Sequence, residues 1–450
     1  MNRYLTIGIF TSLLGISFLA HSAVIAREMK ASSASASPTV PPLEEGSVLD
    51  VLGTHGSYFE EPSLKNLTLS GREGQNLATT LRNDKGFTFN METVTDRDVA
   101  AVVKFLKRHR KVTSLKIKNI KLNILTTALE VLRASTVRFN LLRDLDVSEN
   151  RLNSHFIELC AQVMPSIRSL NVRDTSGLGS AEEEAIGRAE AEAISRMTTL
   201  TSLNISDNTI APVAVEAISG MTNLKSLKVS RTGLGITGTR AISRMTNLTS
   251  LDISFMDLGN EAADIISRMP NLTLLEIRGN KISHRGAQAI SRMNTLKSLN
   301  IRFNDLGPTG AQAISQLRNL KSLDIAVNAV GPAGAQAISQ LNNLIFLNIA
   351  TNGLGPVGAQ ALIHLINLTS LNIRSNNIGP QDAQAISQLR NLKSLDIAVN
   401  AIGPAGAQAI SRMSNLTSLD IRLNNIGDVG RAAIRAMPHL TRLESEPQIY

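Results

Sequence analysis

A leucine recurs every 24 residues through the second half of the chain, and this fixed period limits what the chain can fold into more than any other feature does. We number the positions of each unit from this leucine; position 4 is again leucine and position 6 is usually isoleucine. A unit this short cannot bury its own apolar side, so the sequence predicts an elongated array in which each unit packs against the next. The leucines at position 1 are Leu200, Leu224, Leu248, Leu272, Leu296, Leu320, Leu344, Leu368, Leu392, Leu416 and Leu440.

The first nine positions of each unit predict a short strand followed by a turn. Leu323 and Ile325 are two residues apart, so in a strand both side chains point to the same, inward face. Asn328 follows at position 9, where we expect its buried side chain to bond backbone groups of the turn. Stacked units should then form a ladder of such bonds. Position 9 is occupied by Asn208, Thr232, Met256, Asn280, Asn304, Asn328, Asn352, Asn376, Asn400 and Asn424.

The second half of each unit predicts a short helix. Proline at position 13, as in Pro332, suits the first turn of a helix because its fixed φ is already helical. We expect Gly334 to let the helix lie close to the strand. Helices need about 10 Å of width each, while strands need only about 4.8 Å, so the strands must line the concave side of the array. The apolar residues that should face the core are Ala335, Ile338 and Leu341.

The unit Asn304-Asp-Leu-Gly307-x-x-Gly310-Ala311-x-Ala313-Ile314 resembles the GALA type of bacterial leucine-rich repeat, a relative of the ribonuclease-inhibitor-like repeats. The resemblance covers about residues 112–445. It implies an α/β solenoid, or horseshoe, with parallel strands on the concave face and short helices on the convex face. GALA proteins resemble effectors of plant-pathogenic bacteria that join such repeats to an F-box and recruit host ubiquitin ligases. The resemblance therefore also implies a bacterial effector and a partner from a host cell.

The two ends of the chain differ from the repeats. Residues 1–26 predict a signal peptide, because a basic start precedes 16 uncharged, mostly apolar residues, too few for a membrane span of about 20. Residues 27–62 are rich in Ala, Ser and Pro and predict a disordered linker. We expect an N-terminal cap with degenerate repeats in 63–111 and irregular leucine-rich repeats in 112–199. Residues 200–450 should hold the regular 24-residue repeats and a C-terminal cap.

Residues that could carry out chemistry are few. A single cysteine, Cys160, excludes a disulfide framework and a cysteine-based zinc site within the chain. Cys160 lies at a core position of an expected helix, which favours a buried thiol over a nucleophile. The seven histidines show no metal-ligand spacing, and an aromatic content of 3% disfavours stacking on single-stranded nucleic acid. The sequence predicts a protein that is not an enzyme, with no metal, no cofactor and no nucleic acid partner.

Positions 3, 5 and 7 should point outward on the concave face, with position 8 beside them. Acids, arginines and apolar groups are mixed there, which suits a protein partner. The alternative is structural, because Arg422 can pair with Asp420 or Asp396 across strands and sheet-face Asn and Asp can serve solubility alone. The candidate protein-binding residues are Phe255, Arg278, Arg302, Phe303, Asp324, Arg374, Asp396, Asp420 and Arg422.

A basic run before residue 112 is a second candidate site. It fits an anionic surface, such as lipid headgroups or an acidic protein; a solvated cap helix is the alternative. Its residues are Lys104, Lys107, Arg108, Arg110 and Lys111.

These features predict an exported scaffold, periplasmic or secreted and monomeric, that binds a protein ligand through its concave face without catalysis. One alternative is an effector adaptor that recruits a host ubiquitin ligase, which would require an F-box-like helical bundle in residues 45–111. Another is a structural protein of the envelope, held by its basic N-terminal cap with only peripheral membrane contact.

Overall fold

The computed structural model describes residues 66–68, 86–90, 103–104, 106–107, 112–118, 122–150, 152–175 and 186–445. The chain divides into two units, Met1–Glu60 and Glu61–Tyr450, and every described residue belongs to the second. The predicted signal peptide and linker, most of the predicted N-terminal cap and residues 176–185 therefore lie outside the described residues.

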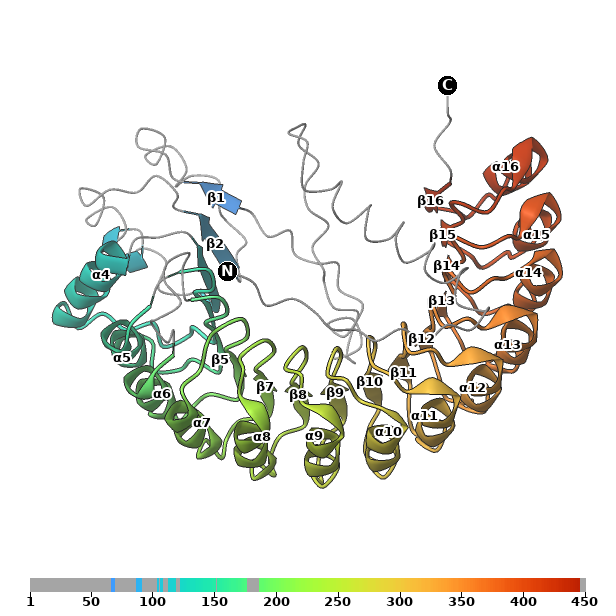
Figure 1. The fold of residues 1–450 in the computed structure, drawn as a ribbon. Helices are drawn as coiled ribbons and strands as arrows, with labels where there is room; N and C mark the ends of the chain where they lie inside the picture. The colour runs from blue at the N-terminus through green and yellow to red at the C-terminus, as the bar shows by residue number, and fades with distance from the viewer. Residues whose placement is uncertain are drawn as a thin grey trace, which may run out of the picture. The chain divides into compact units, whose positions relative to one another are not determined.

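The described strands form one open sheet of parallel strands, whose order follows the sequence (Figure 1). Most strands span positions 3 to 5 of a unit, and equal positions of successive units pair in register, as Leu299 does with Leu323. The strands are β1 (Asn66–Thr68), β2 (Gly86–Asn90), β3 (Ser114–Lys118), β4 (Asp144–Asp146), β5 (Ser169–Asn171), β6 (Ser202–Asn204), β7 (Ser226–Lys228), β8 (Ser250–Asp252), β9 (Leu274–Glu276), β10 (Ser298–Asn300), β11 (Ser322–Asp324), β12 (Phe346–Asn348), β13 (Ser370–Asn372), β14 (Ser394–Asp396), β15 (Ser418–Asp420) and β16 (Arg442–Glu444).

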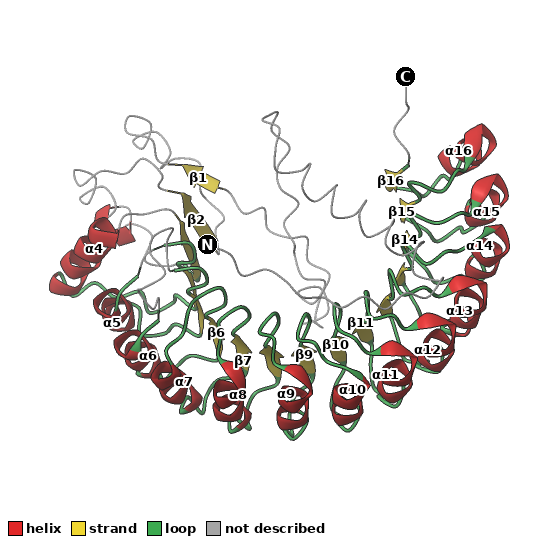
Figure 2. Cartoon of the chain, in the orientation of Figure 1, coloured by secondary structure: helices red, strands yellow, loops and turns green. Residues whose placement is uncertain are grey.

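From β3 to β16, a short helix lies between successive strands on the outer side of the array, while the strands line the inner side (Figures 1 and 2). This arrangement confirms the predicted solenoid with strands on the concave face. The helices are α4 (Leu122–Ala134), α5 (Ser154–Val163), α6 (Arg188–Ser195), α7 (Pro212–Ser219), α8 (Gly235–Ser243), α9 (Gly259–Ile266), α10 (His284–Ile290), α11 (Gly307–Ile314), α12 (Gly331–Ile338), α13 (Gly355–Ala361), the 3-10 helix η3 (Leu362–His364), α14 (Pro380–Ile386), α15 (Gly403–Ile410) and α16 (Gly427–Arg435).

The core lies between the sheet and the helices, as the apolar periodicity predicts. Leu323 and Ile325 from the strand side and Ala335, Ile338 and Leu341 from the helix side are each 0% exposed. Burial of these aliphatic side chains contributes about 25 cal/mol for each Å² removed from water. Because every unit repeats the pattern, one continuous core runs through the described array.

Gly334 has a different function from the one we expected. A Cβ added there would lie 2.9 Å from the Cβ of Ala311 and 3.4 Å from the Cα of Pro308, both in the preceding helix α11. It would also lie 2.5 Å from a methyl carbon of Val330 in its own turn. The glycine therefore allows neighbouring helices to approach each other, and the predicted approach of helix to strand is wrong.

The predicted asparagine ladder is confirmed. Nδ2 of Asn352 donates to the carbonyl oxygens of Ile349 and Ala350 in its own unit and of Ile325 in the preceding unit, at 3.0–3.1 Å. Its Oδ1 accepts the backbone N–H of Asn328 at 2.9 Å. The amide thus satisfies buried backbone groups of two successive units. At the two interruptions of the series, the Thr232 hydroxyl donates to Val229 O and to the sulfur of Met256.

A second ladder, which the sequence analysis missed, runs through the loops that follow the helices. Asparagine at position 24 donates from Nδ2 to a backbone carbonyl of the preceding unit, as Asn343 does to Arg318 O at 2.9 Å. Thr295 holds this position with its hydroxyl bonded to Leu272 O. In the sequence this ladder was marked by the pair Asn-Leu, at positions 24 and 1, which recurs at most junctions between units. The other asparagines of this ladder are Asn223, Asn247, Asn271, Asn319, Asn367, Asn391 and Asn415.

Position 8 has a left-handed backbone in every described unit from residue 142 to residue 423, whatever the residue type. Even the β-branched Val327 has a φ of 56°, a conformation that costs a non-glycine residue about 1–2 kcal/mol. The backbone N–H of Val327 donates to Ala350 O of the next unit, and the asparagine at position 9 follows at once. The ladder therefore holds a strained residue at the end of each strand.

Among the described helices, none is long and apolar enough to cross a membrane.

Replacing Asn352 by alanine should lower the free energy of unfolding by about 2–4 kcal/mol, because buried carbonyls and N–H groups of two units lose their partner. Urea denaturation followed by circular dichroism measures the change. The matched control is Asn343→Ala in the exposed ladder, which should cost about 1 kcal/mol or less. Equal losses in both variants would contradict the assignment of the buried ladder as the main link between units.

Candidate functional site

The acids and amides of position 5 have a structural task on the concave face. Oδ1 of Asp324 accepts the backbone N–H of Ala326 at 3.1 Å, two residues beyond it. The same bond recurs at Asp396 and Asp420, so three of the predicted partner-binding residues also complete the backbone bonding of their strand ends. The interpretation that sheet-face Asn and Asp serve solubility alone is therefore wrong. The other residues with this bond are Asp146, Asn171, Asn204, Asp252, Asn300, Asn348 and Asn372.

Among the units that begin between residues 142 and 416, two depart from this rule, with Lys228 and Glu276 at position 5. In the Lys228 unit the N–H of Ser230 donates to the hydroxyl of Ser206 instead. Glu276 is only 6% exposed, and its carboxylate has no hydrogen bond or ion pair with any described residue. Burial, with a smaller contribution from Asp252, raises the pKa of Glu276 to about 7. The bonding of the strand ends therefore does not explain why Lys228 and Glu276 occupy position 5.

Arginine and phenylalanine side chains pack together beside Glu276. The guanidinium of Arg278 lies 5.1 Å from the ring centroid of Phe255, and that of Arg231 lies 4.7 Å from the same centroid. In the next unit, the guanidinium of Arg302 lies 5.1 Å from the ring centroid of Phe303. These cation–π contacts hold the arginines in fixed positions, each worth about 0.5–2 kcal/mol. We call Phe255, Arg278, Arg302 and Phe303 the Arg–Phe cluster.

The two phenylalanines of this cluster differ in exposure. The ring of Phe255 covers Gly279, where an added Cβ would overlap it. Phe255 is therefore half-buried, in contrast to the exposed residue that we predicted, whereas Phe303 is 47% exposed. An exposed aromatic ring beside partly buried arginines is the composition found at the centre of protein interfaces.

The charges at the C-terminal end of the concave face are paired with one another. Nη2 of Arg422 lies 2.6 Å from Oδ2 of Asp420 and 2.8 Å from a carboxylate oxygen of Glu444. Arg374 also reaches Asp420, at 3.7 Å. Arg422 therefore pairs with Asp420 as predicted, but within its own unit, and the pairing across strands is with Glu444. Burial raises the pKa of the neighbouring Asp396. Because these charges compensate one another, this end offers a partner less unmatched charge than the Arg–Phe cluster does.

The basic run is described only in part. Lys104 is exposed, and Nζ of Lys107 donates to the hydroxyl of Ser135 at 3.2 Å. Arg108, Arg110 and Lys111 lie outside the described residues. The predicted anionic-surface site therefore stays a prediction.

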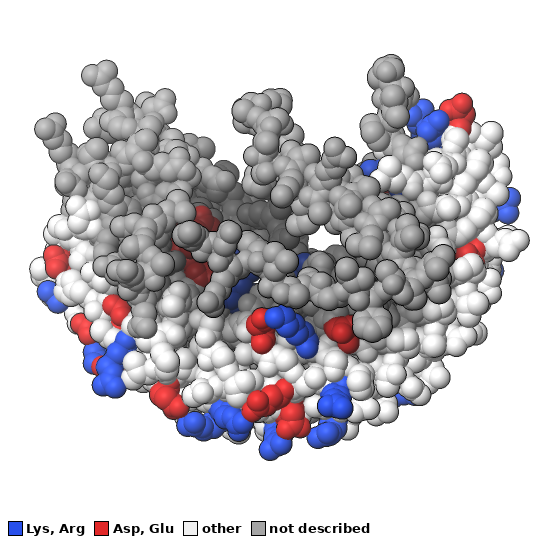
Figure 3. Space-filling view, viewed as in Figure 1, with Lys and Arg blue, Asp and Glu red and all other residues white. Residues whose placement is uncertain are grey.

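Charged residues gather over the outer surface of the N-terminal helices, while the surface over α11 to α15 is mostly uncharged (Figure 3). The arginines of the last helical turn pair with acids of preceding helices, as Arg196 does with Glu158 at 2.8 Å and Arg244 with Glu216 at 3.3 Å. Such exposed pairs contribute about 0–1 kcal/mol each.

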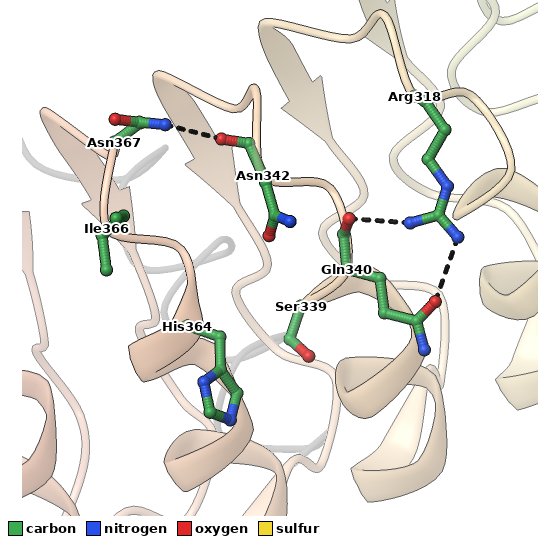
Figure 4. A pocket seen from close by; sticks show the side chains of 7 residues that line it. All are labelled: Arg318, Ser339, Gln340, Asn342, His364, Ile366 and Asn367. Atoms are coloured by element: carbon green, nitrogen blue, oxygen red, sulfur yellow. Dashed lines mark hydrogen bonds between the residues drawn. The ribbon is translucent and has the colours of Figure 1, made fainter.

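A hollow of about 660 Å³ lies beside the loops after α12 and η3 (Figure 4). Arg318 is held there by bonds from Nη1 and Nη2 to the carbonyl and side-chain oxygens of Gln340. No carboxylate or thiol lines this hollow, so its residues offer no pair of acid and base. The lining residues are Arg318, Ser339, Gln340, Asn342, His364, Ile366 and Asn367.

Reactive groups are scarce elsewhere among the described residues. Cys160 is 2% exposed, and burial raises the pKa of its thiol far above the usual range, as expected for a structural cysteine. The described residues contain no group of His, Cys, Asp and Glu side chains that could hold a metal ion.

Comparisons with known proteins agree with this architecture. Models described as leucine rich repeat match residues 198–258, 246–306, 316–339, 340–362, 364–387, 388–411 and 412–434. The crystal structure of an internalin (inlF) from Listeria monocytogenes is similar in fold, with a TM-score of 0.51 and 19% sequence identity. The similarity covers 77% of this chain and 93% of that one. A search of curated proteins gives no match.

Replacing Gly279 by alanine should displace the Phe255 ring and lower the free energy of unfolding by about 2–4 kcal/mol, because overlap adds to the cost of a left-handed alanine. Gly259→Ala is the matched control, since Gly259 has a φ of +68° but nothing within 4 Å of the added Cβ. It should cost only about 1–2 kcal/mol. Thermal or urea denaturation compares the two, and equal costs would contradict the packing of Phe255 over Gly279.

Replacing Glu276 by glutamine should stabilise the protein at alkaline pH and have little effect near pH 5. The pKa of Glu276 is higher in the folded chain than the ordinary glutamate value of 4.5, so the folded state favours the protonated carboxyl. Stability from this group is complete below about pH 4.5, falls as the pH rises, and is lost above about pH 7. Urea denaturation at about pH 8 should show a gain of about 2–3 kcal/mol.

The control for this variant is Glu261→Gln on the exposed side of α9, which should change stability by less than about 1 kcal/mol at both pH values. A gain at Glu276 that is the same at both pH values would show that its carboxyl is not buried in the way described.

Proposed function

We propose, from the premise that the chain belongs to the leucine-rich repeat proteins, that it is an exported scaffold that binds a protein ligand through its concave face without catalysing a reaction. Leucine-rich repeat proteins generally bind other proteins, and the extended inner sheet is the surface that a solenoid offers a partner. The observation that carries the proposal is the Arg–Phe cluster. It combines an exposed aromatic ring with arginines held in place beside it.

The cluster has the properties of an interface centre. Phe303 and the two arginines lie in neighbouring units of the sheet, so one partner segment can contact all three. Aromatic and arginine side chains contribute most of the binding energy in protein interfaces, and they do so best where they are already ordered. The cation–π contacts supply that order before any partner binds.

Export to the periplasm or the medium is part of the proposal and is supported by the apolar N-terminal sequence. A bacterial source, the GALA type and a host-derived partner are further proposals, supported by the repeat sequence alone. The described parts of residues 45–111 include β1 and β2, two parallel strands of the sheet. They lend no support to an F-box-like helical bundle there, and we therefore favour the scaffold over the ubiquitin-ligase adaptor.

The test is photo-crosslinking from the concave face. A photoreactive residue at Phe303 should crosslink one protein from the chain's own envelope or from its host, and the same group at Gln336 on the outer face should not. The combined variant Arg302→Gln, Phe303→Ala and Asp324→Asn should weaken binding of the identified protein by at least about tenfold, or about 1.4 kcal/mol.

A matched variant on the exposed outer helices, Gln312→Ala, Gln336→Ala and Gln408→Ala, should bind as the unaltered chain does. Both variants should keep the circular dichroism spectrum and the melting temperature. Crosslinking from Gln336 alone, or unchanged binding by the concave variant, would show that the partner does not use this face.

A further inference from the structure

Two neighbouring arginines of the concave face have hydrogen-bond donors without acceptors. The Nε atoms of Arg278 and Arg302 are both buried and bond to no described group. The two residues hold position 7 in successive units, and the backbone carbonyl of Arg302 accepts the N–H of Gly279 at 3.0 Å. Buried donors usually have a partner, because an unsatisfied one costs about 1–3 kcal/mol. The Nε atoms are covered by the fold, so an acceptor from a partner would reach the other guanidinium nitrogens, which also make no hydrogen bond with a described residue.

The carboxylates already present do not supply that acceptor. Asp324 lies 4.0 Å from Nη1 of Arg302, too far for a hydrogen bond, and its Oδ1 is bonded to the N–H of Ala326. No described carboxylate lies within 4.0 Å of a nitrogen of Arg278. This separates Arg278 and Arg302 from Arg422, whose Nε bonds to Asp420 at 3.0 Å.

We propose that Arg278 and Arg302 form a binding point for a carboxylate of the protein partner, so that the partner contributes an acidic segment to this part of the concave face. The inference rests on the proposed function, which it makes more specific. A guanidinium pairs with a carboxylate through two parallel N–H bonds, and the Nη atoms of Arg278 and Arg302 are the donors left for such a pair. Phe303 adds an exposed apolar surface beside the acidic side chain of the partner.

Glu276 makes this binding point sensitive to pH. When Glu276 is ionised it places a negative charge beside Arg278, which opposes an incoming carboxylate. When Glu276 is protonated that opposition is removed. Since its pKa is about 7, affinity for an acidic segment should fall as the pH rises from 6 to 8. The charged groups that act on Glu276 from the strands around it are Lys228, Asp252, Arg278 and Asp324.

The test uses two fluorescently labelled peptides, one of five Glu-Gly units and one of five Gln-Gly units. Binding to the whole chain is followed by fluorescence anisotropy at about 20 mM salt, where surface charges are weakly screened. The Glu peptide should bind and the Gln peptide should not. The double variant Arg278→Gln and Arg302→Gln should weaken binding of the Glu peptide by at least about tenfold.

The control variant removes the same charge from the outer side of the array. It is the double variant Arg285→Gln and Arg390→Gln. Both arginines are exposed and make no ion pair with a described residue. This pair should change the affinity by less than about twofold. Equal weakening by both double variants would mean that the peptide follows net charge alone, and absence of binding by the Glu peptide would also overturn the proposal.

Two further comparisons test the pH effect and separate the inference from the proposed function. The unaltered chain should bind the Glu peptide at least about threefold more tightly at pH 6 than at pH 8, and Glu276→Gln should remove that difference. A difference that persists in Glu276→Gln would overturn the assigned effect of this residue. If the photoreactive residue at position 303 crosslinks a protein that still binds the variant lacking both arginines, the proposed contact with an acidic segment is wrong. The proposal that the concave face binds a protein is then still supported.

Discussion

The buried amide at position 9 is the interaction on which the other features depend. A three-residue strand has too few backbone bonds to fix its own position, and the amide adds bonds to its own unit and to the preceding one. Each such bond contributes about 1 kcal/mol net, while leaving the buried groups unpaired would cost more. Because the amides fix the turn, position 8 is held in a left-handed conformation that sets the direction of Phe303; in the Phe255 unit, where position 9 is Met256, Oδ1 of Asn280 in the next unit accepts the N–H of Met256 instead.

Two requirements compete for the same positions of the concave face: the backbone bonding of the strand ends and the binding of a partner. Position 5 must supply an oxygen to the backbone two residues on, so Asp and Asn recur there for a reason internal to the strand. Where the residue is Lys228 or Glu276, that bond is missing and the side chain is free to serve another purpose. Departures from the repeating bond pattern are thus better indicators of function here than charge alone, which is abundant along the whole face.

The amino-acid sequence was sufficient to predict the strand, the turn, the helix and the asparagine ladder, because each rests on residue types at fixed spacing. It did not reveal the left-handed backbone at position 8, since residues as different as Val327 and Phe303 adopt it and no residue type marks it. The contact of Arg278 with Phe255 was missed because it depends on the directions of two side chains that lie 23 residues apart, in neighbouring units. The sequence indicated that Arg422 can pair with Asp420, but it could not show that Arg278 makes no ion pair with a described carboxylate.

The amide bonds also give the array a polarity, because the asparagine side chains at position 9, such as Asn328 and Asn352, bond to their own unit and to the one before it. A duplicated unit therefore carries its own position-9 amide, and the preceding unit already has the backbone groups to which that amide bonds. Residues 316–339 and 388–411, which differ only at Val330 and Ile402, are two such copies that lie three units apart. Recombination can therefore add or remove whole units in such a gene without requiring a new interface between units.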